Sequence, residues 1–140
     1  MSSIPANVAA RNGAEHTFKY PAEPQSVRLI REMADTVIRS WALERLLPDV
    51  KLILSELATN AVAETPGKGI ALLMKHEGSS VSVGIWDSST RMPNERRCAL
   101  EAESGRGMTI VAKTADAHGS HRATDRNCRI GKIVWARIVL

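Results

Sequence analysis

The sequence predicts a two-layer α/β sandwich, in which a mixed but mostly antiparallel sheet carries its helices on one face. Two long segments in the first half of the chain repeat their apolar residues at the period of a helix, and several shorter segments have the apolar runs or the alternation of strands. The length of 140 residues suits one domain with one core. The expected element order is β-α-α-β-β-loop-α-β-β.

The N-terminal part divides into a tail and a first strand. Residues 1–14 are small and polar, and we expect them to form a disordered tail. The folded domain is then expected to span residues 15–140. Its first strand is predicted over residues 16–20, and Pro21 closes it.

Two amphipathic helices follow. The first is predicted over residues 25–43, and the second begins after Pro48 with Asp49 as its N-cap and ends at Thr65. These helices and the sheet should enclose one core. The predicted core residues are Ile30, Met33, Val37, Ile53, Leu54, Leu57, Val83, Ile85, Val134 and Ile138.

An antiparallel hairpin is predicted next. Residues 70–76 form a nearly continuous apolar run, residues 81–85 alternate between apolar and small or polar residues, and Gly78 lies in the polar turn between them. The second strand leads directly into Asp87. We therefore expect a carboxylate where a buried strand ends.

The C-terminal third starts with a long polar stretch. Residues 88–106 are too many for a simple connection in a compact domain, and loops of this length are usually functional lids or disordered. A short helix over residues 107–114 and strands over residues 117–122 and 130–139 complete the predicted chain.

The composition is that of an ordinary globular protein. Hydrophobic residues make up 44% of the chain and charged residues 24%. No apolar run approaches the roughly 20 residues that span a membrane, and residues 1–12 lack the apolar centre of a secretory signal. We therefore expect a cytoplasmic protein that does not act at a membrane.

Charge and cysteine content favour simple interpretations. The net charge of +4 is mild and does not argue for direct nucleic-acid binding. Cys98 and Cys128 are expected to be free thiols, and a disulfide between them is the alternative. A metal site formed by His118, His121 and Cys128 is a further alternative, but solvated loop histidines are favoured over it.

Glu56 and Asn60 are the first candidate pair for chemistry. They are four residues apart on the second predicted helix, so they share a face and flank its apolar stripe. This places a carboxylate and an amide at the rim of the core, where they can be partly dry and still reach a ligand. The alternative is a surface pair with no role, and the bare spacing favours that alternative.

Two further signals come later in the chain. Asp87 can accept a hydrogen bond from a ligand amine or cap the turn after its strand, and taken alone the cap is favoured. Gly105, Arg106 and Gly107 open the short helix, where backbone N–H groups and the helix dipole favour an anion. Arg106 can add a phosphate contact. A tight turn is the alternative for this glycine pair.

The Glu56/Asn60 pair, Asp87 and the glycine pair around Arg106 are each weak signals, but their order along the chain points to one family. The chain has no P-loop sequence and no strand–GxGxxG–helix unit. However, Glu-Leu-Ala-Thr-Asn-Ala at residues 56–61 resembles the N box of the GHKL ATPases, and Asp87 resembles the first residue of their G1 box. Glu-Ser-Gly-Arg-Gly-Met-Thr-Ile-Val at 103–111 resembles the G2 box, and Gly-Lys-Ile-Val-Trp-Ala at 131–136 resembles the last strand of short bacterial members. The resemblance covers roughly residues 16–140 and points to the anti-sigma-factor serine kinases.

This resemblance implies a Bergerat ATP-binding fold and assigns roles by analogy. Glu56 would act as the general base, Asn60 would hold Mg²⁺, and Asp87 would bind the adenine amine of ATP. Residues 88–104 would be the ATP lid. The glycines that would cradle the phosphates are Gly105 and Gly107, and Arg106 between them would add its phosphate contact.

The chain departs from the family pattern at several positions. Ser89 replaces the G1 glycine two residues after the aspartate, and Arg91 replaces the next glycine. Ile133 occupies the expected place of a common threonine on the last strand, and Glu64 stands where histidine is frequent. The first three changes concern adenine binding, whereas the N-box carboxylate and amide are retained.

The resemblance also implies a bacterial regulatory protein. As an enzyme it would be an ATP-dependent protein serine/threonine kinase that phosphorylates a small antagonist protein, or it would sequester a sigma factor, and members of the family commonly form homodimers. The alternative is a partner-binding module of the same fold that has lost efficient ATP binding. Direct DNA binding is disfavoured, and the sequence leaves the identity of the partner open.

Overall fold

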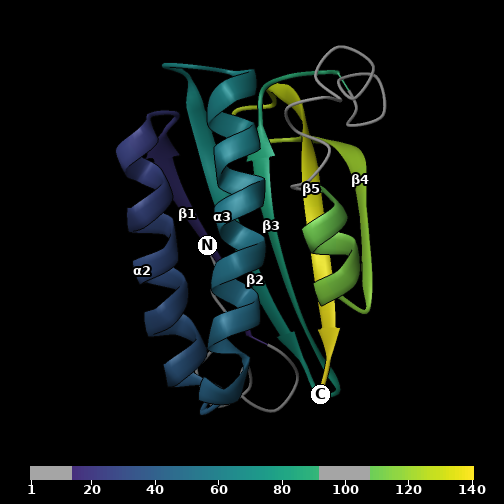
Figure 1. Ribbon diagram of the computed structural model, residues 1–140. Helices are drawn as coiled ribbons and strands as arrows, with labels where there is room; N and C mark the ends of the chain where they lie inside the picture. Colours follow the sequence, from purple (N-terminus) through teal and green to yellow (C-terminus); the bar gives the residue numbers. More distant parts are fainter. Residues whose placement is uncertain (1–13, 92–107) are drawn as a thin grey trace.

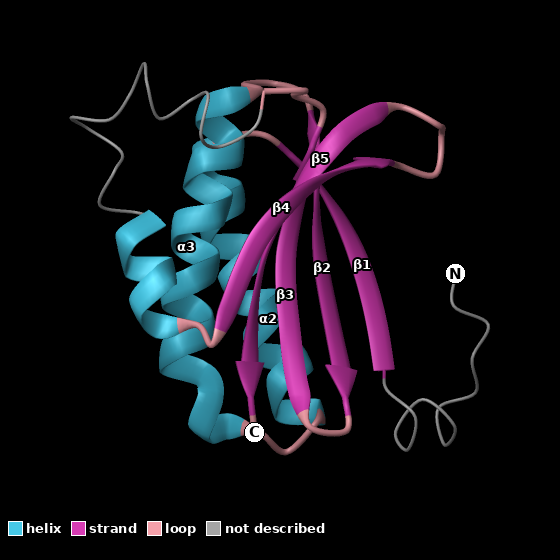
Figure 2. Ribbon diagram, turned by 90° about the vertical axis from the view of Figure 1, so that its right-hand side faces the viewer, coloured by secondary structure: helices cyan, strands magenta, loops and turns pink. Residues whose placement is uncertain are grey.

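The computed structural model describes residues 14–91 and 108–140, and residues 1–13 and 92–107 lie outside this description. Within the described part, five strands form one sheet in the order β1-β2-β3-β5-β4, and each neighbouring pair is antiparallel. Figure 2 shows the helices gathered on one face of this sheet. The predicted two-layer sandwich is therefore confirmed, with antiparallel pairing throughout the described sheet.

The first strand and the first helix lie close to their predicted positions. β1 spans Ala14–Pro21 and α2 spans Pro24–Ser40. Pro24 begins α2, where a missing N–H removes no helical hydrogen bond. The helix ends before its predicted end because Ala42 adopts a positive φ of 59° and the chain turns into a short 3₁₀ helix over Glu44–Leu46.

The central helix, α3, spans Leu47–Glu64, and its start corrects one expectation. Asp49 lies inside the first turn and makes no N-cap hydrogen bond. The helix can begin before Pro48 because first-turn N–H groups have no acceptor within the helix. The Asp49 carboxylate still faces the positive end of the helix dipole. The buried stripe of this helix consists of Leu47, Val50, Ile53, Leu54, Leu57, Ala58 and Ala61.

Two hairpins make up the rest of the sheet. β2 (Gly69–Glu77) and β3 (Ser80–Asp87) form the predicted antiparallel hairpin. β4 (Ala117–Thr124) pairs with β5 (Ile130–Val139), and β5 has the predicted bounds. β5 also pairs with β3, so the C-terminal strand lies inside the sheet rather than at its edge.

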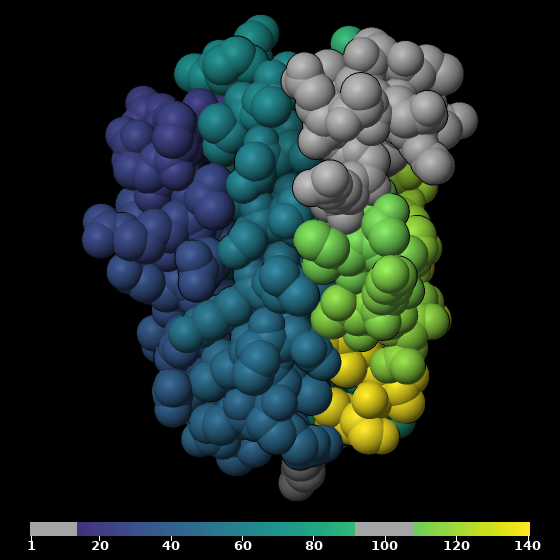
Figure 3. Space-filling model, in the orientation of Figure 1, coloured from purple at the N-terminus to yellow at the C-terminus, as the bar shows by residue number. Residues whose placement is uncertain are grey.

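One core lies between the sheet and its helices. Eight of the ten predicted core residues are buried, and Met33 and Val134 are half-buried. The helix over residues 108–114 adds Val111, which is completely buried in the same cluster. In Figure 3, the residues of α2, α3 and this helix lie side by side across one face of the molecule. Among the described residues, no helix is both long enough and apolar enough to cross a membrane.

Candidate functional site

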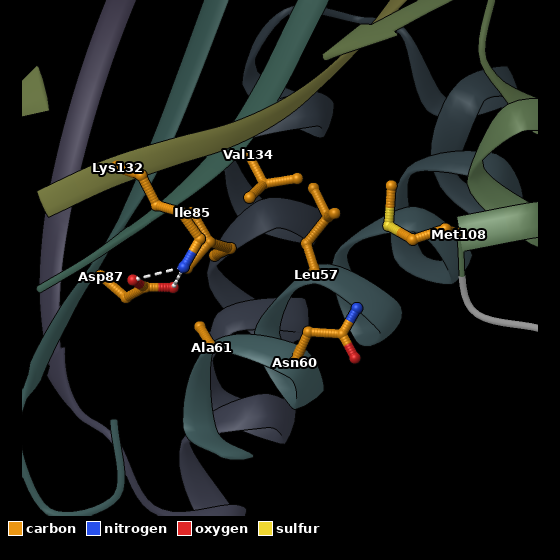
Figure 4. Close-up of a pocket in the computed structure, with 8 residues that line it drawn as sticks. All are labelled: Leu57, Asn60, Ala61, Ile85, Asp87, Met108, Lys132 and Val134. Atoms are coloured by element: carbon orange, nitrogen blue, oxygen red, sulfur yellow. Dashed lines mark hydrogen bonds and ion pairs between the residues drawn. The ribbon is translucent and has the colours of Figure 1, made fainter. Parts of the chain in front are cut away.

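A small cavity lies between α3 and the ends of β3 and β5 that meet at Asp87 (Figure 4). Its volume is about 10 Å³, which is roughly the room that one water molecule needs. It combines a carboxylate, an ammonium group and an amide with an apolar wall. The residues that line it are Leu57, Asn60, Ala61, Ile85, Asp87, Met108, Lys132 and Val134.

The helix α3 supplies three of these residues from one face. Asn60 and Ala61 follow Leu57 by three and four residues, so both lie one turn further along the same side of the helix. Leu57 and Ala61 are buried, whereas Asn60 is half-buried at the rim. Glu56 is also half-buried, but it is not among the residues that line the cavity. The structure thus brings Asn60, but not Glu56, into the same cavity as Asp87.

Asp87 and Lys132 form a buried ion pair at the closed end of the cavity. The two residues are directly opposite each other in the register of β3 and β5. The Lys132 Nζ donates to both carboxylate oxygens of Asp87, at 2.9 and 3.1 Å. Only 2% of Asp87 and 1% of Lys132 is exposed. Charged residues are almost never buried to this extent unless they are paired.

Burial is the main influence on the Asp87 carboxyl. It raises the pKa of Asp87, because a low-polarity environment disfavours the ionised form. The hydrogen bond and charge of Lys132, and the backbone N–H of Ser89, act on this pKa in the opposite direction. Burial prevails, so the pKa of Asp87 lies above its usual value.

Three of the residues that depart from the GHKL pattern contact one another just after β3. The Ser89 backbone N–H donates to Asp87 Oδ1 at 2.9 Å, and the Ser89 hydroxyl donates to Glu64 Oε2 at 3.2 Å. The Arg91 backbone N–H donates to the Ser89 hydroxyl at 3.0 Å. The Arg91 guanidinium lies 4.0 Å from the Glu64 carboxylate. The polar groups of the turn after β3 are therefore bonded to other residues of this chain.

The remaining departure, Ile133 on β5, does not lie opposite Asp87. Ile133 pairs with Trp86 and lies on the face of the sheet opposite the helices, so it is not the residue beside the aspartate. That residue is Lys132, which the sequence reasoning missed. Strand alternation contained the signal, because Lys132 lies two residues before the predicted core residue Val134 and shares its face.

The phosphate-binding candidates are not among the described residues. Gly105, Arg106 and Gly107 lie outside the description, as does most of the predicted lid. Met108, the first described residue after this gap, lines the cavity and belongs to the helix over residues 108–114. The described start of the predicted G2 region therefore reaches the site.

The metal and thiol alternatives concern a separate part of the chain. His118 and His121 lie on β4, and Cys128 is an exposed free cysteine in the turn before β5. Across residues 14–91 and 108–140, no group of three His, Cys, Asp or Glu side chains is arranged to hold a metal ion. Cys98 lies outside the described residues.

Comparison with known families decides the class of protein. The sequence profile of the histidine kinase-like ATPase domain matches residues 20–138, which include every element except the start of β1 and the last residue of β5. The chain belongs to this family. Membership supports an ATP-binding regulatory function, and for domains of this class in general it implies ATP with Mg²⁺. No curated protein matches the chain.

In this histidine kinase-like ATPase domain, the site fits adenine only in part. The apolar wall of Leu57, Ile85 and Val134 suits the flat face of a base. However, both Asp87 oxygens already accept hydrogen bonds from Lys132. The cavity has no room for a purine ring system in this arrangement.

Proposed function

We propose that this chain is a regulatory protein of the anti-sigma-factor kinase type that acts by binding a protein partner, either a sigma factor or an antagonist of an anti-sigma factor. The observation that carries the proposal is the buried pair of Asp87 and Lys132, which leaves the base pocket closed. A protein with this site can keep the fold and its partner-binding surfaces while ATP binding is weak. Family membership supports the regulatory role.

Complex formation without nucleotide tests this proposal. The purified full chain would be mixed with each sigma factor and each candidate antagonist of its own organism, and complexes would be measured by light scattering after size-exclusion chromatography. We expect a stoichiometric complex with one of these proteins, and we expect its affinity to be unchanged by Mg²⁺-ATP. A chain that binds none of them, or binds only when ATP is present, would contradict the proposal.

A protein serine kinase is the second candidate function. Glu56 and Asn60 support it, because both are half-buried and lie one turn apart on α3, with Asn60 at the cavity. In this proposal Glu56 would be the general base for a partner serine and Asn60 would hold Mg²⁺ near the phosphates. Among the residues that line the cavity, the carboxylate is that of Asp87, which is bound to Lys132 and so is not offered for this role.

Transfer of labelled γ-phosphate to the identified partner tests the second candidate. If the chain is a kinase, Glu56→Ala should slow the transfer by roughly 10²–10⁴-fold, which is typical for loss of a general base. Thr59→Ala, at an exposed position of the same helix, is the matched control and should transfer phosphate at the wild-type rate. Absence of transfer by the wild-type chain would leave partner binding as the function.

A further inference from the structure

We propose that Lys132 determines whether the base pocket of this chain accepts adenine. Its ammonium group occupies the place on Asp87 that the amine of an adenine base would take. The inference rests on the proposed function, because it treats Asp87 as the group that would read the base. It adds the identity of the residue that keeps the pocket closed.

The hydrogen bonds of Asp87 show how completely its carboxylate is engaged. A carboxylate offers about four lone-pair positions to donors. The Lys132 ammonium donates to both oxygens, and the backbone N–H of Ser89 donates to Oδ1 as well. Three of the four positions are therefore taken by donors from the chain itself.

The side chain of Lys132 also occupies space that a base would need. Figure 4 shows it running from β5 past Ile85 to reach Asp87. Its ammonium group ends between β3 and β5, opposite the face of α3 that carries Leu57 and Ala61. The cavity that remains holds about 10 Å³, so adenine can enter only if Lys132 leaves.

The exchange of Lys132 for a base amine is unfavourable. A base amine is a neutral donor, whereas Lys132 brings a full positive charge to a buried carboxylate. Breaking a buried ion pair is strongly destabilising when a charge is left without a partner. One hydrogen bond from the base to Asp87 replaces only part of that interaction. The pair therefore discriminates against adenine rather than recruiting it.

The turn after β3 independently supports the conclusion that the Asp87 carboxylate is engaged by the chain itself. The hydroxyl of Ser89 bonds to Glu64, and the Arg91 backbone N–H bonds to that hydroxyl. Only 7% of the Glu64 side chain is exposed. The segment that follows Asp87 is thus held by contacts within the chain, and it keeps the Ser89 N–H on the carboxylate.

The test compares nucleotide affinities of Lys132→Thr and of a matched control. Threonine keeps a hydroxyl donor for Asp87 but frees the space of the lysine stem. We expect Lys132→Thr to bind Mg²⁺-ATP at least about tenfold more tightly than the wild-type chain in titration calorimetry, because no buried charge must be expelled. Lys68→Thr removes the same charge from an exposed lysine just before β2, and it should show no such gain.

A second nucleotide shows whether the gain comes from base reading. Purine riboside triphosphate carries the same phosphates as ATP but lacks the 6-amino group. Lys132→Thr should prefer ATP over this analogue, because its Asp87 can accept from the amine. The wild-type chain should bind both equally weakly. Equal gains for both nucleotides would overturn the proposal that Lys132 competes with the base amine for Asp87, because only the bulk of its side chain would then close the pocket.

A second variant at residue 132 keeps the test decisive if Lys132→Thr does not fold. Thermal unfolding of each protein would be measured first, because Lys132→Thr leaves Asp87 buried with fewer donors. Lys132→Gln keeps a neutral donor of similar reach, and it should also bind ATP more tightly than the wild-type chain, since an amide is more easily expelled than an ammonium group.

Two results would overturn the inference in distinguishable ways. Wild-type protein that binds ATP as tightly as the folded variants would show that Lys132 does not close the pocket, and the nucleotide site would stand. Folded proteins that all fail to bind ATP at millimolar concentration would remove the base-reading role of Asp87 as well. Neither result would decide partner binding, which the complexes formed without nucleotide test separately.

Discussion

Lys132 and Asp87 carry the only ion pair in the described residues in which both side chains are almost completely buried. Such a pair is weak evidence for stability, because the desolvation of two charges can exceed their attraction. Its effect here is on the chemistry of the site, since both oxygens of the Asp87 carboxylate already accept hydrogen bonds from Lys132. The surface ion pairs among residues 14–91 and 108–140 have no comparable consequence.

Leu57 belongs both to the packed core and to the lining of the cavity. It is 2% exposed, lies in the main core cluster and lines the cavity. Leu57→Ala should lower the free energy of unfolding by roughly 2–5 kcal/mol, because it leaves a cavity in a closely packed core. Urea unfolding measures this loss. Leu52→Ala on the same helix is the control, because Leu52 is 44% exposed, and a similar cost at both positions would contradict the packing of α3.

Asp35 gives a prediction about pH. Its carboxylate accepts a hydrogen bond from Arg39 and lies 2.7 Å from the Lys51 Nζ, and these contacts hold the pKa of Asp35 below its usual value of 3.8. A pKa that is lower in the folded state contributes stability above the unfolded pKa, and that contribution is lost as pH falls through the folded pKa. The difference in unfolding free energy between wild type and Asp35→Asn should therefore be present at neutral pH and disappear in acid.

Urea titrations of both proteins over this pH range would measure that difference. A difference that grew as the pH fell would contradict the sign of the pKa shift and the role of Arg39 and Lys51 as its cause.

At the scale of elements, two glycines allow indole rings to lie against the open face of the sheet. Trp86 lies against Gly131 of β5, and its Nε1 donates to the carbonyl of Ala123 at 3.0 Å. Trp135 lies in the same way against Gly119 of β4. The absence of a Cβ is what permits these close approaches, and the contacts link three adjacent strands on the face away from the helices.

Gly131→Ala should test how tightly this face is packed. A Cβ at residue 131 would overlap first with the backbone carbonyl oxygen of Asp87, and it would lie 2.7 Å from the Trp86 ring. We expect a loss of roughly 1–3 kcal/mol in unfolding free energy, as for other overpacked sites. Gly69→Ala is the matched control, because nothing lies within 4 Å of a Cβ there. Equal stability of the two variants would show that the backbone of β3 and the Trp86 ring can both shift to admit the Cβ at little cost.

At the scale of the whole molecule, the helices and the sheet share one core. Buried residues of α2, α3, the helix over 108–114 and the strands belong to a single cluster. The helices cover one face of the sheet (Figure 2). Trp86 and Trp135 lie on the other face, against Gly131 and Gly119. Neither layer can keep its apolar face covered if the other unfolds, so the described layers should unfold together.

Urea unfolding followed by two probes would check this cooperativity. Far-ultraviolet circular dichroism reports mainly the helices. Tryptophan fluorescence reports the open face of the sheet through Trp86 and Trp135, and the end of α2 through Trp41. The two transitions should coincide in midpoint and slope, as for a two-state domain. Separate midpoints would show that the helical layer and the sheet are not one cooperative unit.

Features that depend on local periodicity were determined by the sequence alone. The two helices, the β2–β3 hairpin and the bounds of β5 were predicted, because the spacing of apolar residues follows directly from helix and strand geometry. The placement of Asn60 at the rim of the core, and of Asp87 where a buried strand ends, follows from the same spacings. The motif order also indicated the family that the profile match establishes.

Only the tertiary structure decided what those residues contact. Asp87 and Lys132 are 45 residues apart in the chain, and they meet because β5 inserts beside β3 in one particular register. A shift of that register by one residue would bring Ile133, the position favoured by the sequence pattern, to the same place. Register is set by burial of whole strands against α3 and by the pairing of distant segments. The sequence of one strand determines which of its side chains share a face. It does not determine which residues of another strand lie opposite them.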